Sequence, residues 1–181
     1  MESWKGHHLL LQALAELNHL SNWVCWIAGG AQRREEVEYE KSLHAQALEL
    51  GLGRRIRFLG QRSDVPQLLA AADIFCQPNV GAEPFGIAFI EAMHAGLPVV
   101  TSAIGGALEI FDDSCGRLVR PNDCAGLAAN LNMLVKDPAL RRRLGNAAIF
   151  RSSQLCDPDQ QIKRLDTIIR QSVKNGSNTS Q

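Results

Sequence analysis

Two glutamates near the middle of the chain, Glu83 and Glu91, flank a short turn, and seven residues separate them. Between them, Phe85, Gly86 and Ile87 place backbone N–H groups at the start of a predicted helix, where the helix dipole favours anions. Because Gly86 has no side chain, a ligand can approach its backbone closely. Carboxylates are poor partners for phosphate but good acceptors for sugar hydroxyls. The pattern therefore predicts a site for a phosphate that carries sugars at both ends, which is a nucleotide sugar.

The elements around this turn predict how it is positioned. Residues 73–78 form an apolar run closed by a proline, and residues 79–84 are predicted to form a loop. From about residue 86 the apolar residues recur at helical spacing, and the Gly-Leu-Pro at 96–98 ends that helix. A second buried strand begins at Val99. This strand, loop, helix and strand form the unit of a doubly wound sheet, in which ligands bind at the carboxyl ends of the strands.

The run E-P-F-G-I-A-F-I-E-A-M-x-A-G-x-P-V-V resembles the acidic motif of retaining glycosyltransferases of family 4. The resemblance implies that Glu83 contacts the transferred sugar, that Glu91 holds the ribose, and that the amides of Phe85, Gly86 and Ile87 meet the diphosphate and sugar. The alternative is that both glutamates are solvated surface charges, as single glutamates usually are. We favour the functional interpretation because Glu91 falls within a strongly apolar helix, where an unpaired carboxylate would be costly.

The resemblance also implies roles for residues outside the motif. Lys5, in a Lys-Gly pair that opens the first helix, would reach the donor diphosphate, and with Glu83 it completes the expected catalytic pair. Five further residues would border the donor: Gly30, Gly60, Gln61, Gly105 and Gly106. Each of the glycines is equally compatible with a plain turn. His7 and His8 are expected to be surface residues, because no third metal ligand is suggested nearby.

The fold class expected is α/β, a Rossmann-like doubly wound parallel sheet of about five strands with helices on both faces. It corresponds to the carboxyl-terminal half of a GT-B glycosyltransferase. We expect residues 1–174 to form one donor-binding domain that ends in helices, and residues 175–181 to form a disordered tail. The family pattern begins with a strand that residues 1–4 are too short and polar to supply. That strand is central in the order 3-2-1-4-5-6, so its absence predicts a gap in the sheet.

Composition narrows the classes of function. Lys and Arg number 19, as do Asp and Glu, and this zero net charge argues against nucleic acid as a partner. The five cysteines show no Cys-x-x-Cys spacing, and the N-terminus has no apolar signal core. These features predict a cytoplasmic protein with reduced thiols and no transmembrane segment, which leaves peripheral membrane contact open. GT-B enzymes need no bound metal and no Asp-x-Asp motif is present, so we expect no metal and no cofactor.

The function expected from the resemblance is transfer of a sugar, of the hexosyl type, from a nucleotide diphosphate sugar with retention at the anomeric carbon. GT-B enzymes bind the acceptor in a separate amino-terminal domain, so the expected partner is such a domain or a second polypeptide. We therefore expect the chain alone to lack transferase activity. Two alternatives remain open: a nucleotide-sugar-binding module or truncated fragment without turnover, and a sugar-nucleotide epimerase. The acidic motif argues against the epimerase.

Overall fold

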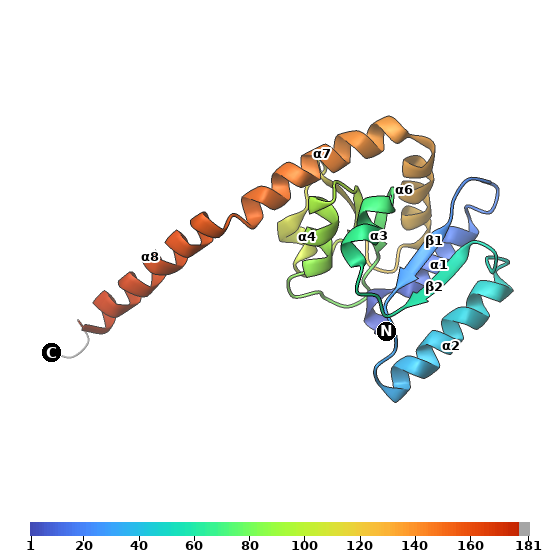
Figure 1. Ribbon diagram of the computed structural model, residues 1–181, viewed down its shortest axis with the longest axis horizontal. Coiled ribbons are helices and arrows are strands. Elements are labelled where there is room, and N and C mark those ends of the chain that lie inside the picture. The colour runs from blue at the N-terminus through green and yellow to red at the C-terminus, as the bar shows by residue number, and fades with distance from the viewer. Residues whose placement is uncertain (178–181) are drawn as a thin grey trace.

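In the computed structural model, the structure describes residues 1–177, and side chains as far as residue 172 (Figure 1). The helices are η1 (Ser3–Lys5), α1 (His7–Ala15), α2 (Arg34–Glu49), α3 (Val65–Ala71), α4 (Ile87–His94), α5 (Ala107–Ile110), α6 (Cys124–Lys136), α7 (Pro138–Leu155) and α8 (Pro158–Ser177). The strands are β1 (Cys25–Ala28), β2 (Ile56–Gly60), β3 (Phe75–Gln77), β4 (Val99–Ser102) and β5 (Gly116–Val119). This alternation confirms the α/β class expected from the sequence.

The strands form two parallel sheets. β1 pairs with β2, and β3, β4 and β5 pair in that order. Among the described residues no strand joins β1 to β3, which is where the sequence predicted a gap. All four residues of β4 are buried, as expected of a parallel strand that has neighbours on both sides and helices on both faces.

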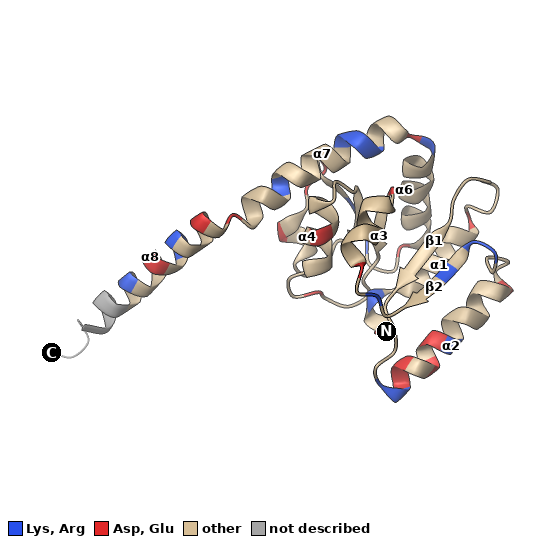
Figure 2. Ribbon diagram, in the orientation of Figure 1, with Lys and Arg blue, Asp and Glu red and all other residues tan. Residues whose placement is uncertain are grey.

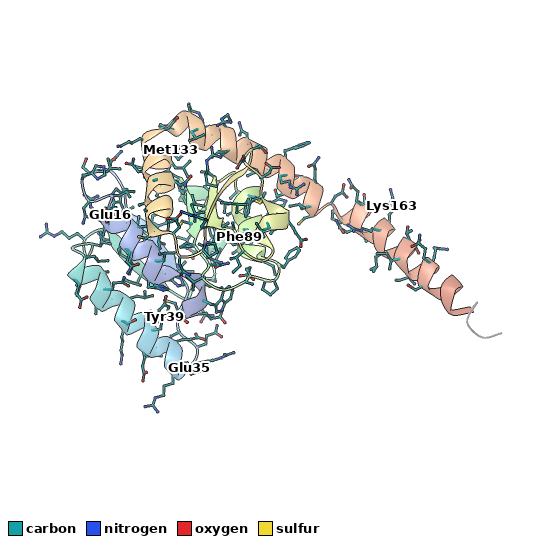
Figure 3. The ribbon with its side chains drawn as sticks, turned by 180° about the vertical axis from the view of Figure 1, so that it is seen from behind. Glu16, Glu35, Tyr39, Phe89, Met133 and Lys163 are labelled. Carbon is teal, nitrogen blue, oxygen red and sulfur yellow. The ribbon has the colours of Figure 1, made fainter. Side chains whose placement is uncertain are left out.

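Helices cover both faces of the sheets and divide the core in two. One cluster joins α1, α2 and α6 to β1 and β2, and it includes Leu11, Leu43 and Leu127. The other joins α4, α5 and α7 to β4 around Phe89, which Figure 3 shows inside the body of the molecule. Helix α8 extends away from that body (Figure 1). It exposes four apolar side chains: Ile162, Leu165, Ile168 and Ile169.

Local signals in the sequence account for several helix ends. Asp123 caps α6 by accepting a hydrogen bond from the N–H of Gly126 at 2.8 Å, and Asp137 caps α7 through the N–H of Leu140 at 2.8 Å. Gly96 ends α4 in the left-handed conformation with φ of 77°. Asp64 is an exception, because its carboxylate pairs with Arg62 and accepts no capping bond.

The end of the chain differs in part from the expectation. Helix α8 continues to Ser177, so residues 175–177, which we assigned to a disordered tail, are helical. The other residues of that predicted tail, 178–181, lie outside the described residues. No helix among residues 1–177 is both long enough and apolar enough to cross a membrane. Basic and acidic residues both recur along the ribbon (Figure 2), in keeping with the zero net charge.

Candidate functional site

Three of the predicted residues meet where β1 and β2 end. The N–H of Gly29 donates to the carbonyl of Gly60 at 2.8 Å, which joins the two strand ends. A Cβ added at Gly30 would lie 3.3 Å from the backbone nitrogen of Gln61, so these two backbones are close neighbours. The structure therefore brings Gly30, Gly60 and Gln61 together at the carboxyl edge of the sheet, where open α/β sheets bind ligands.

The segment that carries Lys5 is fixed to the loop that follows β3. The carbonyl of Trp4 accepts hydrogen bonds from the N–H groups of Val80 at 2.8 Å and Gly81 at 3.2 Å. Gly6 has a φ of 73°, and its Cα lies so close to the carbonyl oxygen of Pro78 that a Cβ would overlap it. The Lys5 ammonium lies 3.8 Å from the Glu2 carboxylate, a half-exposed pair of small energy. The lysine is therefore anchored by its backbone, and its side chain can turn to a ligand.

The loop that carries Glu83 rests on the glycine pair after β4. The N–H of Gly106 donates to the carbonyl of Glu83 at 2.8 Å. Gly105 has a φ of 62°, and a Cβ there would lie 2.6 Å from the same carbonyl oxygen. Side chains at these two positions would push the loop away. Gly105 and Gly106 thus support the backbone of the acidic motif, a role that the sequence did not predict for them.

The turn between the two glutamates presents free backbone donors. Gly86 is the N-cap of α4 with a φ of 82°, and a Cβ there would overlap the ring of Phe89. In the described part of the chain, the N–H groups of Phe85, Gly86 and Ile87 donate to no protein acceptor. They lie at a helix N-terminus, where such groups bind anions. This arrangement agrees with the predicted meeting of amides and phosphate.

The position of Glu91 contradicts the argument that an apolar helix would bury its carboxylate. It lies one turn after Ile87 on α4, but its side chain is exposed, whereas its neighbours Ala92 and Met93 are buried. An exposed carboxylate carries no desolvation cost, so the apolar helix is no reason by itself to assign Glu91 a function. What places it in the site is that it lines a cavity.

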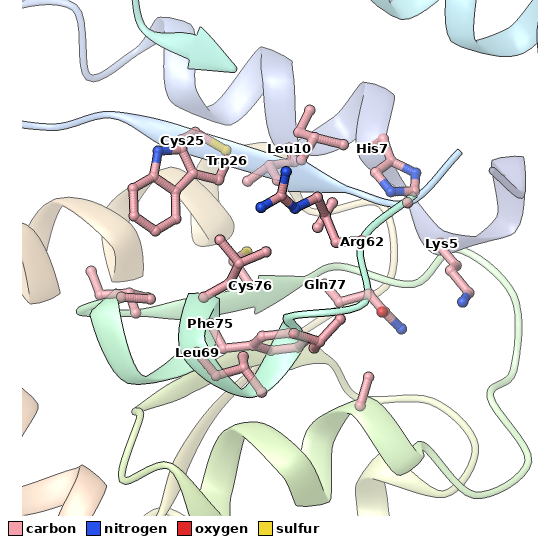
Figure 4. Close-up of a pocket in the computed structure, with 18 of the residues that line it drawn as sticks. Lys5, His7, Leu10, Cys25, Trp26, Arg62, Leu69, Phe75, Cys76 and Gln77 are labelled. Atoms are coloured by element: carbon pink, nitrogen blue, oxygen red, sulfur yellow. The ribbon is translucent and has the colours of Figure 1, made fainter. Parts of the chain in front are cut away.

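This cavity of about 1120 Å³ lies between β1 and β3, and we call it the β1–β3 cavity (Figure 4). Lys5, Gly30, Gln61 and Glu91 all line it. Glu83 does not, although the loop that carries it is tied to the Lys5 segment. The structure therefore gathers the predicted residues into one region, with the cavity on one side and the loop of the acidic motif on the other.

Three residues of this region were not predicted from the sequence. Asn79 lies two residues after β3 and Ser102 ends β4, and both are fully buried with a polar atom that has no partner within the described structure. His7, expected on the surface, lines the cavity and also has an unpartnered ring nitrogen, Nδ1. The available signal for Asn79 was a polar residue directly after the proline that closes the apolar run. For His7 the local sequence gave none.

Burial, together with the smaller effect of the positive charges of Lys5 and the N-terminus, lowers the pKa of His7 to about 4. The folded state thus keeps His7 neutral, whereas the unfolded chain protonates it near pH 6.5. We expect the stability to be complete above pH 6.5 and to fall, through this residue, by up to about 3 kcal/mol as the pH drops to 4. Denaturant unfolding of the wild type and His7→Gln at each pH measures the difference. If the free energy of unfolding changed equally with pH in both proteins, the lowered pKa of His7 would be contradicted.

Among the described residues, no three His, Cys, Asp or Glu side chains gather as metal ligands. All five cysteines are free, and burial raises the pKa of Cys25 to about 12. The Cys25 thiol is therefore protonated at neutral pH. The groups that the sequence predicted for chemistry in this region are the Lys5 ammonium, the Glu83 and Glu91 carboxylates and the backbone amides of residues 85–87, and Arg62 also lines the cavity.

The fold is an α/β domain of parallel strands, with the predicted ammonium, carboxylates and backbone amides gathered near the carboxyl edge of its sheet. A family model described as glycosyl transferases group 1 matches residues 1–151. The phosphatidyl-myo-inositol mannosyltransferase of Mycobacterium leprae is 43% identical over 145 residues, which is 78% of this chain and 37% of that protein. The chain belongs to the group 1 glycosyl transferases.

Solved structures agree with this assignment. Anabaena Alr3699/HepE, crystallised with UDP and glucose, is 34% identical with a TM-score of 0.82 over 92% of this chain and 46% of that one. The carboxyl-terminal domain of LpcC from Francisella tularensis is 25% identical with a TM-score of 0.76, over 85% of this chain and 80% of that one. The fold matches the carboxyl-terminal half of GT-B glycosyltransferases. This chain spans less than half the length of the full relatives cited here.

Proposed function

We propose that this chain is the donor-binding half of a retaining glycosyltransferase and binds a nucleotide diphosphate sugar. The observation that carries the proposal is the row of N–H groups at Phe85, Gly86 and Ile87, which have no protein acceptor among the described residues and lie between Glu83 and Glu91. The loop that leads to them is hydrogen-bonded at Val80 and Gly81 to the Trp4 carbonyl, next to Lys5. HepE, crystallised with UDP and glucose, supports a sugar nucleotide as the ligand.

Each group has a part in the proposed reaction. The amides and the Lys5 ammonium hold the diphosphate and stabilise the negative charge that develops as it leaves. Glu83 positions the transferred sugar, a hexose, and Glu91 accepts hydrogen bonds from the ribose. Gly30, Gly60 and Gln61 border the base. Because an ammonium and amides neutralise the leaving group, the reaction needs neither metal nor cofactor.

The remaining part of the enzyme supplies the acceptor site. The full relatives reported above are more than twice as long as the share that this chain matches. We place the acceptor in an amino-terminal domain or a second polypeptide, and the chain alone binds its donor without transferring the sugar. The five free thiols suit the reducing cytoplasm, where we place the reaction.

Titration calorimetry with UDP, GDP and ADP and their sugar conjugates, with and without EDTA, tests this proposal. We expect one nucleotide to bind equally in both buffers. Glu91→Ala should weaken its binding about tenfold, because a hydrogen bond to a charged group contributes about 1.5–3 kcal/mol. The matched control is Glu49→Ala, an exposed glutamate at the carboxyl end of α2 that does not line the cavity. Equal affinities in the two variants would contradict the role of Glu91.

A further inference from the structure

Helix α7 is fixed by close contact to α4, the helix that carries Glu91. Figure 1 shows α7 running beside α4, and the two helices pack on each other. The backbone of Gly145 in α7 touches the carbonyl of Gly96, directly after α4, so closely that a Cβ would overlap the oxygen. A Cβ added at Gly96 would also lie 3.3 Å from Cδ1 of Ile149 in α7. The position of Glu91 relative to α7 is therefore set by backbone contact.

Farther along α7, Arg151 reaches the end of α5. Its Nη2 donates to the carbonyl of Glu109 at 2.8 Å, and its Nε donates to the carbonyl of Ile110 at 3.1 Å. These are the last two residues of α5, and the final carbonyls of a helix have no partner within it. A half-buried guanidinium thus holds the end of α5 against α7 through two hydrogen bonds.

Helix α5 in turn carries the two glycines that support the loop of Glu83. Besides the hydrogen bond from Gly106 to the Glu83 carbonyl, a Cβ at Gly106 would lie 2.9 Å from the carbonyl oxygen of Pro84. A Cβ at Gly105 would lie 2.9 Å from the backbone nitrogen of Glu83. Because α5 has only four residues, it is too short to be stable by itself. Its position, and that of the loop resting on it, depends on outside contacts.

We propose that Arg151 is a positioning residue, which holds α5 against α7 and thereby sets where the Glu83 carboxylate lies relative to Glu91. This inference rests on the proposed function, in which Glu83 positions the transferred sugar and Glu91 binds the ribose. Since α4 and α5 are both fixed to α7, the separation of the two carboxylates follows from the packing of this one helix. Loss of Arg151 should therefore affect the sugar end of the donor and spare the nucleotide end.

Titration calorimetry of Arg151→Ala tests the proposal with matched pairs of ligands. The probes are UDP with UDP-glucose, GDP with GDP-mannose and ADP with ADP-glucose, and the pair that binds to the wild type is used. We expect binding of the sugar conjugate to weaken about fivefold, because a displaced Glu83 loses part of a charged hydrogen bond. Binding of the nucleotide alone should weaken less than about twofold. A general loss of structure would weaken both equally.

A double-mutant cycle shows whether Arg151 acts through Glu83. In a Glu83→Ala background the sugar has already lost its carboxylate, so Arg151→Ala should cause no further loss of conjugate binding. Arg151→Lys is the second variant, so that the test does not depend on the alanine variant remaining folded. It keeps the charge but lacks the rigid fork that reaches two carbonyls, and it should show the same pattern with a smaller effect.

The matched control is Arg117→Ala. Arg117 is also half-buried, and its guanidinium also donates to two backbone carbonyls, those of Asp113 at 2.9 Å and Gly116 at 3.3 Å. Both acceptors follow α5 and do not belong to it. This variant removes a comparable pair of hydrogen bonds, and we expect it to leave the ratio of conjugate to nucleotide affinity unchanged.

Hydrogen exchange read by NMR tests the structural link without any ligand. In Arg151→Ala the amide of Gly106 should exchange at least about tenfold faster, because the helix that carries it is no longer held. The reference is the amide of Gly29, which donates to the carbonyl of Gly60 at the same distance of 2.8 Å and has no contact with α5. Its exchange should be unchanged.

The results that would overturn the proposal are distinct from those that would overturn the proposed function. If the wild type binds a conjugate and Arg151→Ala binds it equally well, or loses conjugate and nucleotide to the same extent, Arg151 has no positioning role. Unchanged exchange at Gly106, or a further loss of conjugate binding in the Glu83→Ala background, would also overturn it. If the wild type binds none of the six probes, the proposed function fails, and the positioning of a sugar fails with it.

Discussion

Replacing Gly6 with alanine is expected to lower the free energy of unfolding by about 3 kcal/mol. Two costs add at this position. The φ of 73° is unfavourable for any residue with a Cβ, and that Cβ would overlap the carbonyl oxygen of Pro78. Pro78 belongs to the segment between β3 and the acidic motif, so relief of the overlap must separate the Lys5 segment from that loop. Urea unfolding of the two proteins gives the difference.

Gly51→Ala is the matched control for this prediction. Gly51 has a φ of 71°, but a Cβ there would have no neighbour within 4 Å. Its substitution should therefore cost only the conformational part, about 1 kcal/mol. If Gly6→Ala were no more destabilising than Gly51→Ala, the close contact with Pro78 would not exist in solution.

Gly145→Ala is expected to destabilise the protein by a similar amount, about 3 kcal/mol, for a reason that involves packing alone. Gly145 lies within α7, where alanine by itself would favour the helix by about 1 kcal/mol. Its Cα, however, touches the carbonyl of Gly96 after α4, and a Cβ would overlap that oxygen. The backbone at Gly145 and the backbone at Gly96 are each held by their own helix. Relief of the overlap therefore requires α7 to move away from α4, which exposes part of the core that the two helices share.

The sign of the change in stability shows which of two effects is larger, the helix preference of alanine or the overlap with the Gly96 carbonyl. Without the contact, Gly145→Ala would stabilise the protein, whereas with it the substitution destabilises. The adjacent Asn146 is exposed on the same helix, and Asn146→Ala should change the unfolding free energy by less than about 0.5 kcal/mol. A Gly145→Ala protein as stable as the wild type in urea would contradict the contact.

The position of the acidic motif could be predicted from the sequence because its signals are local. The proline after the apolar run ends a strand, Gly86 starts α4 and Gly96 ends it, and each acts on residues within one turn of itself. The α/β class followed from the same kind of signal repeated along the chain. The gap between the sheets was also expected, because the resembled family begins with a central strand that residues 1–4 are too short and polar to supply.

Other features of the site could not be predicted, because they depend on segments far apart in the sequence. The hydrophobic run around Glu91 suggested burial, yet the residue is exposed, since only one side of α4 packs on the core. His7 looked like a surface residue, but α1 places it on the cavity. The support of Glu83 by Gly106 joins residues that are separated by a complete helix and strand.

The sequence by itself thus determined the elements, their order and the motif that carries the candidate chemistry. Helix caps, strand periodicity and turn glycines act through neighbours a few residues away. Tertiary structure alone decided how the Lys5 segment is fixed to the loop of the acidic motif, which side of α4 is exposed, and which side chains line the cavity between β1 and β3. These outcomes depend on which distant backbones pack in contact, and packing of that kind is set by the whole fold rather than by any local pattern.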